Sequence, residues 1–208
     1  MNASIDTVGP MQGGALVADN LTLARGGMPL FAGLSFRVAP GEALLITGRN
    51  GAGKSSLLRA IAGLLPIGSG ILRNPYRAAW AAGEPALKPD RSVEDELAFW
   101  AKLDGATNIS VAIQAMGLDG LLDLPCGMLS SGQRQRVNLA RAIASGALLW
   151  LLDEPTNALD TESANRLIAA IETHRAEGGL AVIATHQPLA LANASELRLN
   201  RPTFTEDP

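Results

Sequence analysis

A glycine-rich string between a short apolar run and a helical pattern constrains the fold of this chain more than any other feature. Gly48 to Ser55 reads GRNGAGKS and matches G-x-x-x-x-G-K-[ST] in full. The run ALLIT at 43–47 predicts a buried strand before the string, and KSSLLRAIAGLL at 54–65 predicts an amphipathic helix after it. A glycine-rich turn that only caps a helix is the alternative, but this composition produces a full accidental match very rarely. The string therefore predicts a phosphate-binding loop.

The same string predicts which groups hold the phosphates of a nucleoside triphosphate. Its glycines let backbone N–H groups turn toward phosphate oxygens, and the following helix adds its positive end. Lys54 is expected to reach the β- and γ-phosphates, and Ser55 is expected to offer its hydroxyl to Mg²⁺. The nucleotide-binding candidates in the loop are Gly48, Arg49, Asn50, Gly51, Ala52, Gly53, Lys54, Ser55 and Ser56.

Further apolar runs of strand length predict the sheet that carries the loop. LLWLLD at 148–153 and LAVIAT at 180–185 are continuous apolar runs, as expected for strands covered on both faces. With the strand at 43–47 they predict a mainly parallel central sheet. Alternating residues between 15 and 38 predict a small antiparallel β layer that precedes it.

Helical patterns complete the expected architecture. Helix-like pieces begin near residue 84, and the segment RQRVNLARAIAS at 134–145 looks helical as well. We expect one α/β domain of the P-loop NTPase class at 15–208, with flanking helices and an inserted helical lobe at about 84–145. Residues 1–14 combine glycine and proline with small polar residues and are expected to be a disordered tail.

Composition and charge exclude several classes of function. The 17 Lys and Arg against 20 Asp and Glu give a net charge of −3, which provides no electrostatic footprint for nucleic acid. The single cysteine, Cys126, cannot form an internal disulfide, and this fits a reducing, cytoplasmic setting. The first positive side chain is Arg25, so no secretory signal is expected. The longest stretch without charge, 178–195, is interrupted by polar residues and proline, so a membrane role is expected to be peripheral.

Two carboxylates follow the apolar run at 148–153. Asp153 ends the run and is expected to lie beside the phosphate-binding loop, where it can hold Mg²⁺ through water. Glu154 follows directly and is expected to act as the base that orients the attacking water or accepts its proton. Taken alone, such a pair is more often a solvated turn. After a matched P-loop, the catalytic interpretation is favoured.

A third motif makes a family resemblance visible. Residues 129–133 read LSSGQ and lead into a helical pattern, which resembles the LSGGQ signature of ABC-type ATPases. The P-loop, LLDEP, NALD and the histidine at the end of VIATH also match that family, over residues 15–200 in all. The resemblance implies ATP and Mg²⁺ as ligands and ATP hydrolysis to ADP and phosphate, energising a translocase, as the activity. A simple helix N-cap is the alternative interpretation of LSSGQ taken alone.

The resemblance implies that the active form is a head-to-tail pair of copies. In that family the signature of one copy closes over the nucleotide that the P-loop of the other copy holds. The signature residues implied to act in trans are Ser130, Ser131, Gly132 and Gln133. Asp160 ends NALD, which resembles the D-loop at the dimer interface. His186 is implied to contact the γ-phosphate and to hold Glu154 and the attacking water in line, although a lone histidine after a strand is usually structural.

Three positions depart from the family pattern. Glu84 stands where a glutamine usually contacts the metal and the water; a carboxylate can still bind Mg²⁺ but cannot donate a hydrogen bond as an amide can. An exposed loop acid is the alternative for Glu84. Ser131 replaces a glycine of the signature, and we expect it to be tolerated. Arg25 stands where an aromatic side chain usually stacks on adenine; it could stack on the base, or be merely solvated.

Within the family, the chain resembles the ATPases of cytochrome c maturation, the haem exporter group. The short chain, LFAGLSF near the start and ATHQPL at 184–189 carry this resemblance. It implies a homodimer on the cytoplasmic face of the inner membrane, attached to an integral membrane subunit of the CcmB type. Haem or any other cargo is not expected to bind this chain directly. The alternatives are the ATPase of another small ABC transporter, or a non-transport ABC ATPase that acts on ribosomes or DNA.

Two further expectations concern surfaces. The lobe contains an apolar set that includes Leu87, Leu124 and Met128, and we expect the membrane subunit to dock there. His174 lies on a polar face of a predicted helix and is expected to be solvated.

Overall fold

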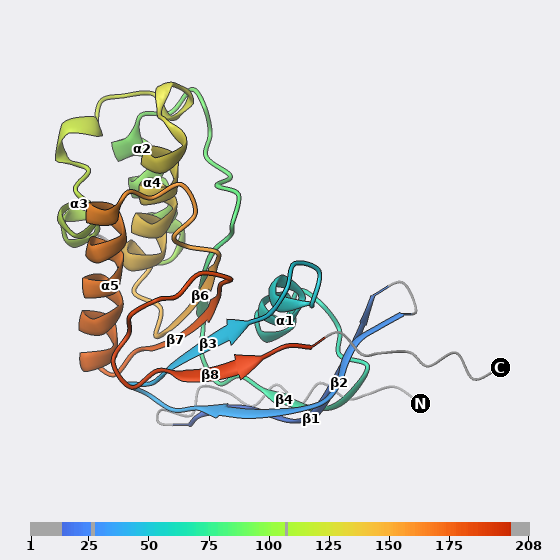
Figure 1. The fold of residues 1–208 in the computed structure, drawn as a ribbon. Coiled ribbons are helices and arrows are strands. Elements are labelled where there is room, and N and C mark those ends of the chain that lie inside the picture. Colours follow the sequence, from blue (N-terminus) through green and yellow to red (C-terminus); the bar gives the residue numbers. More distant parts are fainter. Residues whose placement is uncertain (1–13, 26–27, 107, 201–208) are drawn as a thin grey trace.

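A parallel five-stranded sheet organises the molecule and carries the phosphate-binding loop (Figure 1). The computed structural model describes residues 14–25, 28–106 and 108–200; apart from Gly14, the tail expected at 1–14 lies outside this part. The strand order is β5, β6, β7, β3, β8, and every neighbouring pair is parallel. The strands are β5 (Ala78–Ala81), β6 (Leu149–Asp153), β7 (Leu180–Ala184), β3 (Ala43–Thr47) and β8 (Ser195–Arg198).

The parallel arrangement brings the chemistry-bearing residues to one edge of the sheet. The loop after β3, the carboxylates that end and follow β6, and the histidine after β7 all leave from the carboxyl ends of neighbouring strands. In open α/β sheets, ligands bind in the crevice outside these ends. The expected mainly parallel sheet is confirmed.

A smaller antiparallel sheet lies beside the central one, as expected. It has the order β2, β1, β4, with β1 (Leu16–Arg25), β2 (Met28–Val38) and β4 (Ser69–Arg73). The alternation of β6 shows how two cores share one strand. Leu149 and Leu151 pack with the antiparallel sheet and α1 (Lys54–Ile61), whereas Trp150 and Leu152 pack with the lobe helices on the other face.

The helical lobe is inserted between β5 and β6 (Figure 1). It contains α2 (Val93–Leu103), α3 (Ser110–Met116) and α4 (Ser131–Ala144), with short 3₁₀ turns η1 (Asp119–Leu121) and η2 (Cys126–Met128) between α3 and α4. Ser92 begins α2, because its side chain accepts a hydrogen bond from the N–H of Asp95 at 3.1 Å. The remaining helix, α5 (Thr161–Ala176), joins β6 to β7. Among the described residues, no helix combines the length and apolar character needed to cross a membrane.

The helix predicted at 54–65 is shorter than expected. α1 ends at Ile61, because Gly63 adopts a φ of +74° that a helix cannot continue. Leu64 follows with 70% of its surface exposed, so its apolar side chain does not extend the buried face of α1.

The expectation that His174 is solvated is wrong. Its ring stacks on Trp150, with 3.9 Å between the ring centroids and 7° between the planes. Its Nε2 lies 3.0 Å from the carbonyl oxygen of Leu148. Burial lowers the pKa of His174 below its ordinary value. A Cβ at Gly179 would lie 2.2 Å from this ring, so a glycine five residues later makes room for the stack.

Candidate active site

The phosphate-binding loop is built from glycines that no other residue can replace without strain. Gly48 has a φ of +142°, and a Cβ there would lie 2.5 Å from the carbonyl oxygen of Leu199. Gly53 has a φ of +99° and occupies the N-cap position of α1, where no side chain caps the helix. The first N–H groups of α1 therefore have no side-chain acceptor and are suited to an anion.

Lys54 joins the loop to the catalytic strand. Its side chain is almost completely buried, and its Nζ donates a hydrogen bond to the carbonyl oxygen of Gly48 at 3.0 Å. The same ammonium lies 3.3 Å from Oε1 of Glu154. A buried lysine needs such partners, because an unpaired charge is costly away from water. The ammonium thus lies between the start of the loop and the carboxylate that follows β6.

Ser55 and Asp153 form the group that fits a magnesium ion. The hydroxyl of Ser55 donates to Oδ1 of Asp153 at 3.0 Å. Burial raises the pKa of Asp153, and the charge of Glu154 adds to this; the hydrogen bond from Ser55 and the charges of Arg59 and Lys54 act in the opposite direction. Hydroxyl and carboxylate oxygens are the ligands that Mg²⁺ prefers, with water and phosphate oxygens completing its shell. The described residues contain no cluster of three or more acidic, histidine or cysteine side chains suited to a metal ion.

Glu154 is held in a backbone conformation that non-glycine residues rarely adopt. Its φ is +48°, and its N–H donates to the carbonyl oxygen of Ala184 at 2.8 Å. Its Oε2 lies 2.7 Å from Nδ1 of His186 and accepts a longer bond of 3.3 Å from the N–H of the same residue. Such strain persists where the surroundings fix the residue, and it is common at active sites.

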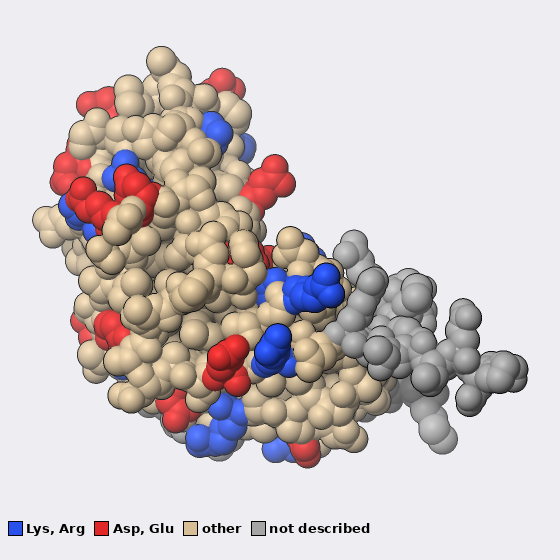
Figure 2. Space-filling model, viewed as in Figure 1, with Lys and Arg blue, Asp and Glu red and all other residues tan. Residues whose placement is uncertain are grey.

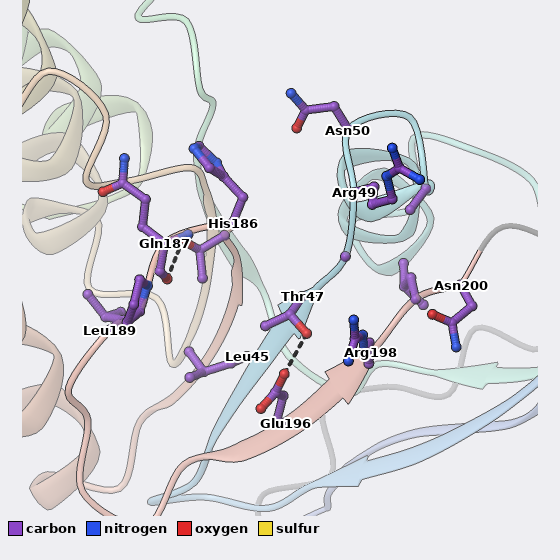
Figure 3. Close-up of a pocket in the computed structure, with 15 residues that line it drawn as sticks. Leu45, Thr47, Arg49, Asn50, His186, Gln187, Leu189, Glu196, Arg198 and Asn200 are labelled. Atoms are coloured by element: carbon purple, nitrogen blue, oxygen red, sulfur yellow. Dashed lines mark hydrogen bonds between the residues drawn. The ribbon is translucent and has the colours of Figure 1, made fainter.

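The structure therefore brings five of the predicted residues together: Lys54, Ser55, Asp153, Glu154 and His186. Beside them, Arg49, Asn50 and His186 line a cavity of about 980 Å³ that extends along β3 and β8 (Figure 3). Thr47 and Glu196 form one wall, joined by a hydrogen bond of 2.6 Å from the threonine hydroxyl. Figure 2 shows that lobe and core meet at a concave side, with Lys and Arg side chains on the core next to it.

The signature residues lie elsewhere, at the start of α4 in the helical lobe (Figure 1). Ser130 is the N-cap of α4: its Oγ accepts from the N–H of Gln133 at 3.2 Å, and Oε1 of Gln133 accepts from the N–H of Ser130 at 2.8 Å. These two residues thus form a complete capping box. Ser130 and Ser131 are exposed, and Gly132 packs against the carbonyl oxygen of Ala158, which a Cβ would approach to 2.6 Å.

Asp160 has a local partner in its own chain. Its Oδ1 accepts a hydrogen bond of 2.7 Å from the N–H of Ser163 and so caps α5. This hydrogen bond holds the pKa of Asp160 below its ordinary value. The side chain is exposed, and its role at a dimer interface stays a prediction.

Of the positions that depart from the family pattern, Glu84 has a described side chain, whereas Arg25 does not. Glu84 is exposed and follows Gly83, which lies against the carbonyl oxygen of Asp153: a Cβ at Gly83 would be 3.3 Å from that atom. The segment that carries Glu84 thus passes the end of β6. Arg25 ends β1, and its side chain lies outside the described part of the structure.

Sequence analysis missed two buried amides on α4, Gln135 and Asn138. Gln135 donates to the carbonyl oxygen of Pro155 at 3.1 Å, and Asn138 donates to that of Ala82 at 2.8 Å. The available signal was a pair of amide side chains three residues apart in an otherwise helical pattern that begins with the signature.

Comparisons with known proteins agree with this geometry. Residues 31–157 match the family model described as ABC transporter. "Cytochrome c biogenesis ATP-binding export protein CcmA" of Rhodospirillum rubrum is 45% identical over 218 aligned positions, covering 98% of this chain and 93% of the relative. The protein of the same name from Zymomonas mobilis is 46% identical, covering 88% of this chain and 84% of the relative. The chain belongs to the CcmA family of ABC ATP-binding proteins.

Solved structures place the CcmA family fold among ABC ATPase domains. "Putative ABC transporter (ATP-binding protein) from Pyrococcus furiosus" aligns with a TM-score of 0.79 and 25% identity, covering 89% of this chain and 97% of that one. The expected fold class, an α/β P-loop domain with an inserted helical lobe, is therefore confirmed. Membership in the CcmA family implies ATP binding and, in general, ATP hydrolysis.

Proposed function

We propose that this chain is the ATP-hydrolysing subunit of a membrane-bound ABC translocase that serves the biogenesis of c-type cytochromes. The names of the CcmA relatives support the process. The convergence of Lys54, Glu154 and His186 at the carboxyl edge of the sheet supports the chemistry and carries the proposal.

Each residue of this group has a distinct task in the proposed reaction. Lys54 neutralises the β- and γ-phosphates, and the N–H groups at the start of α1 bind the same phosphates. Ser55 and Asp153 would hold Mg²⁺, which supplies charge neutralisation of the phosphates when bound. Glu154 accepts the proton of the attacking water or orients that water, and His186 keeps the Glu154 carboxylate aimed at it.

The complete site is proposed to need a second copy of the chain. The P-loop group lies at the start of α1 in the core, whereas the exposed signature serines lie at the start of α4 in the helical lobe. We therefore expect a single chain to contact a nucleotide from one side at each of these two places. In a head-to-tail pair, Ser130, Ser131 and Gly132 of the second copy would face the γ-phosphate. Asp160 would then lie at the interface between the copies, and Glu84 would approach the metal from its own chain.

The membrane partner is proposed to be an integral subunit of the CcmB type, with this chain peripheral on the cytoplasmic face of the inner membrane. Apolar side chains exposed on the lobe support a docking surface there: Phe99 is 42% exposed, Leu124 38% and Met128 74%. Large exposed apolar groups gathered on one lobe mark interaction sites more often than chance. Cargo, haem included, would be handled by the membrane partner rather than by this chain.

The test is purification of the chain with its native membrane partner, followed by an ATPase assay with and without haem. Wild type should hydrolyse Mg-ATP, and Glu154→Gln should lower turnover by about 10² to 10³ while Mg-ATP still binds. Lys54→Ala should weaken nucleotide binding itself, measured by calorimetry. Near-normal turnover in Glu154→Gln would overturn the assigned base, and absence of Mg-ATP binding by wild type would overturn the proposed function.

A further inference from the structure

The turn that follows β6 and carries Glu154 is held by a hydrogen bond from α4, the helix that begins with the signature. Pro155 follows Glu154 and lies in a buried position, so its carbonyl oxygen needs a hydrogen-bond donor from the protein. Nε2 of Gln135, on α4, donates to it at 3.1 Å. Gln135 is only 2% exposed, so water does not compete for this contact.

The contact does not end at Gln135. Asn138 lies three residues further along α4, on the same face of the helix, and is 3% exposed. Its Nδ2 donates to the carbonyl oxygen of Ala82 at 2.8 Å and lies 3.5 Å from Oε1 of Gln135. The two side chains, which we call the amide relay, therefore connect the carbonyl groups of Pro155 and Ala82 through α4.

Both ends of the amide relay lie next to groups of the candidate active site. Pro155 is the residue after Glu154, whose φ of +48° requires its surroundings to fix it. Ala82 precedes Gly83 and Glu84, and Gly83 lies against the carbonyl oxygen of Asp153. Glu154 itself is contacted from the core, where Lys54 and His186 contact its carboxylate and Ala184 accepts from its N–H, and from within the turn, where the N–H of Asn157 donates to its carbonyl oxygen at 3.1 Å.

We propose that Gln135 and Asn138 are positioning residues, which make the placement of the Glu154 carboxylate depend on the position of the signature helix. Since hydrolysis needs the base and the water aligned, a small displacement of this turn lowers turnover. Nucleotide binding depends on the P-loop and Lys54, to which the amide relay makes no hydrogen bond in the described part of the chain. The inference rests on the proposed function, because it takes Glu154 as the base.

The test uses apolar replacements of similar size, Gln135→Met and Asn138→Leu, in the full chain with its membrane partner. Each should lower kcat by about 10- to 100-fold and leave KM and the Kd for Mg-ATP within about twofold. The kcat of the double variant should be only slightly lower than that of the less active single variant, because the effects of substituting residues that act as one unit are not additive. Val137→Ala is the matched control, because Val137 lies between the two amides in the sequence and is fully buried. This substitution should lower Tm without the same loss of kcat.

A second measurement separates failure of this inference from failure of the proposed function. Hydrogen exchange of the segment 153–160 should be faster in Gln135→Met than in Val137→Ala, whether or not the protein hydrolyses ATP. If the wild-type protein lacks ATPase activity, the proposed function fails, and hydrogen exchange of this segment becomes the only test of whether the amide relay holds the turn. Unchanged exchange in Gln135→Met overturns the inference. The inference is also overturned if KM rises in Gln135→Met or Asn138→Leu by the same factor by which kcat falls, or if Val137→Ala lowers kcat as much as these variants do.

Discussion

Nδ1 of His186 lies 2.7 Å from Oε2 of Glu154, although 32 positions separate the two residues in the chain. A carboxylate can only accept, so the imidazole nitrogen that faces it carries the proton. The other ring nitrogen is then directed away from Glu154. Because 46% of the His186 side chain is exposed, that nitrogen can accept a hydrogen bond from water, and it can donate one to a phosphate oxygen only when the ring carries both protons.

His186→Ala should therefore impair hydrolysis more than binding. Loss of this contact frees the Glu154 carboxylate on one side and removes one preorganised donor, which commonly lowers turnover by about 10² to 10³. Steady-state ATPase assays and calorimetry on the same preparation measure both quantities. A variant with wild-type kcat would show that the histidine only supports the loop after β7.

Gly132→Ala should damage the signature through packing rather than through a lost hydrogen bond. The added methyl group would lie 2.6 Å from the carbonyl oxygen of Ala158, so α4 and the turn before α5 must separate. Overpacking of this kind costs about 1–3 kcal/mol. We expect a lower Tm together with reduced ATPase activity. Gly120→Ala is the control, because nothing lies within 4 Å of its added Cβ; equal effects of the two substitutions would contradict the packing argument.

Local patterns predicted the strands and loops that hold the chemistry. The runs that became β3, β6 and β7 are buried along most of their length, and a strand covered on both faces is apolar in sequence whatever surrounds it. Their parallel pairing then brings Lys54 and Glu154 to the same edge without any further information. For this reason the sequence alone predicts that these residues lie close together.

The parts that sequence analysis missed depend on contacts between distant segments. β8 has the sequence SELR, mostly exposed, and only its pairing with β3 makes it a strand. His174 lies on a mainly polar helix, and its burial comes from Trp150 and from the missing side chain at Gly179. Gln135 likewise resembles any polar residue of an amphipathic helix until Pro155 is seen beside it. Periodicity reports only on neighbours in sequence.

Substitutions that introduce a charge into the apolar surface of the lobe should prevent docking of the membrane partner. Leu124→Asp, and separately Met128→Asp, place a charge in the apolar surface that we propose as the docking site, and a buried unpaired charge there would be costly. Pull-down with the membrane partner should be lost, while ATP binding by the isolated chain is retained. Leu64→Asp is a matched control, since Leu64 is 70% exposed but follows α1 on the core. Normal pull-down by both lobe variants would show that the partner docks elsewhere.

The stacked pair of His174 and Trp150 should make the stability of the fold depend on pH. Burial lowers the pKa of His174 in the folded state, and this outweighs the hydrogen bonds with the backbone of Leu148 and Leu180 and the charge of Glu177, which raise it. The unfolded chain therefore binds a proton more readily than the folded one. By linkage, stability is full above the unfolded imidazole pKa of about 6.5 and is lost as pH falls toward the lower folded value.

His174→Phe isolates this effect, because phenylalanine can keep the stack on Trp150 but cannot titrate. Leu148 retains a partner for its carbonyl oxygen, since the N–H of Leu180 also donates to it at 2.8 Å. Melting curves between about pH 8 and pH 5 should show a smaller fall in Tm for the variant than for wild type. The lost contact with Nε2 would appear as an offset at every pH, so the difference in slope is the measured quantity. Parallel curves for the two proteins would mean that His174 takes up its proton in the folded state as easily as in the unfolded chain.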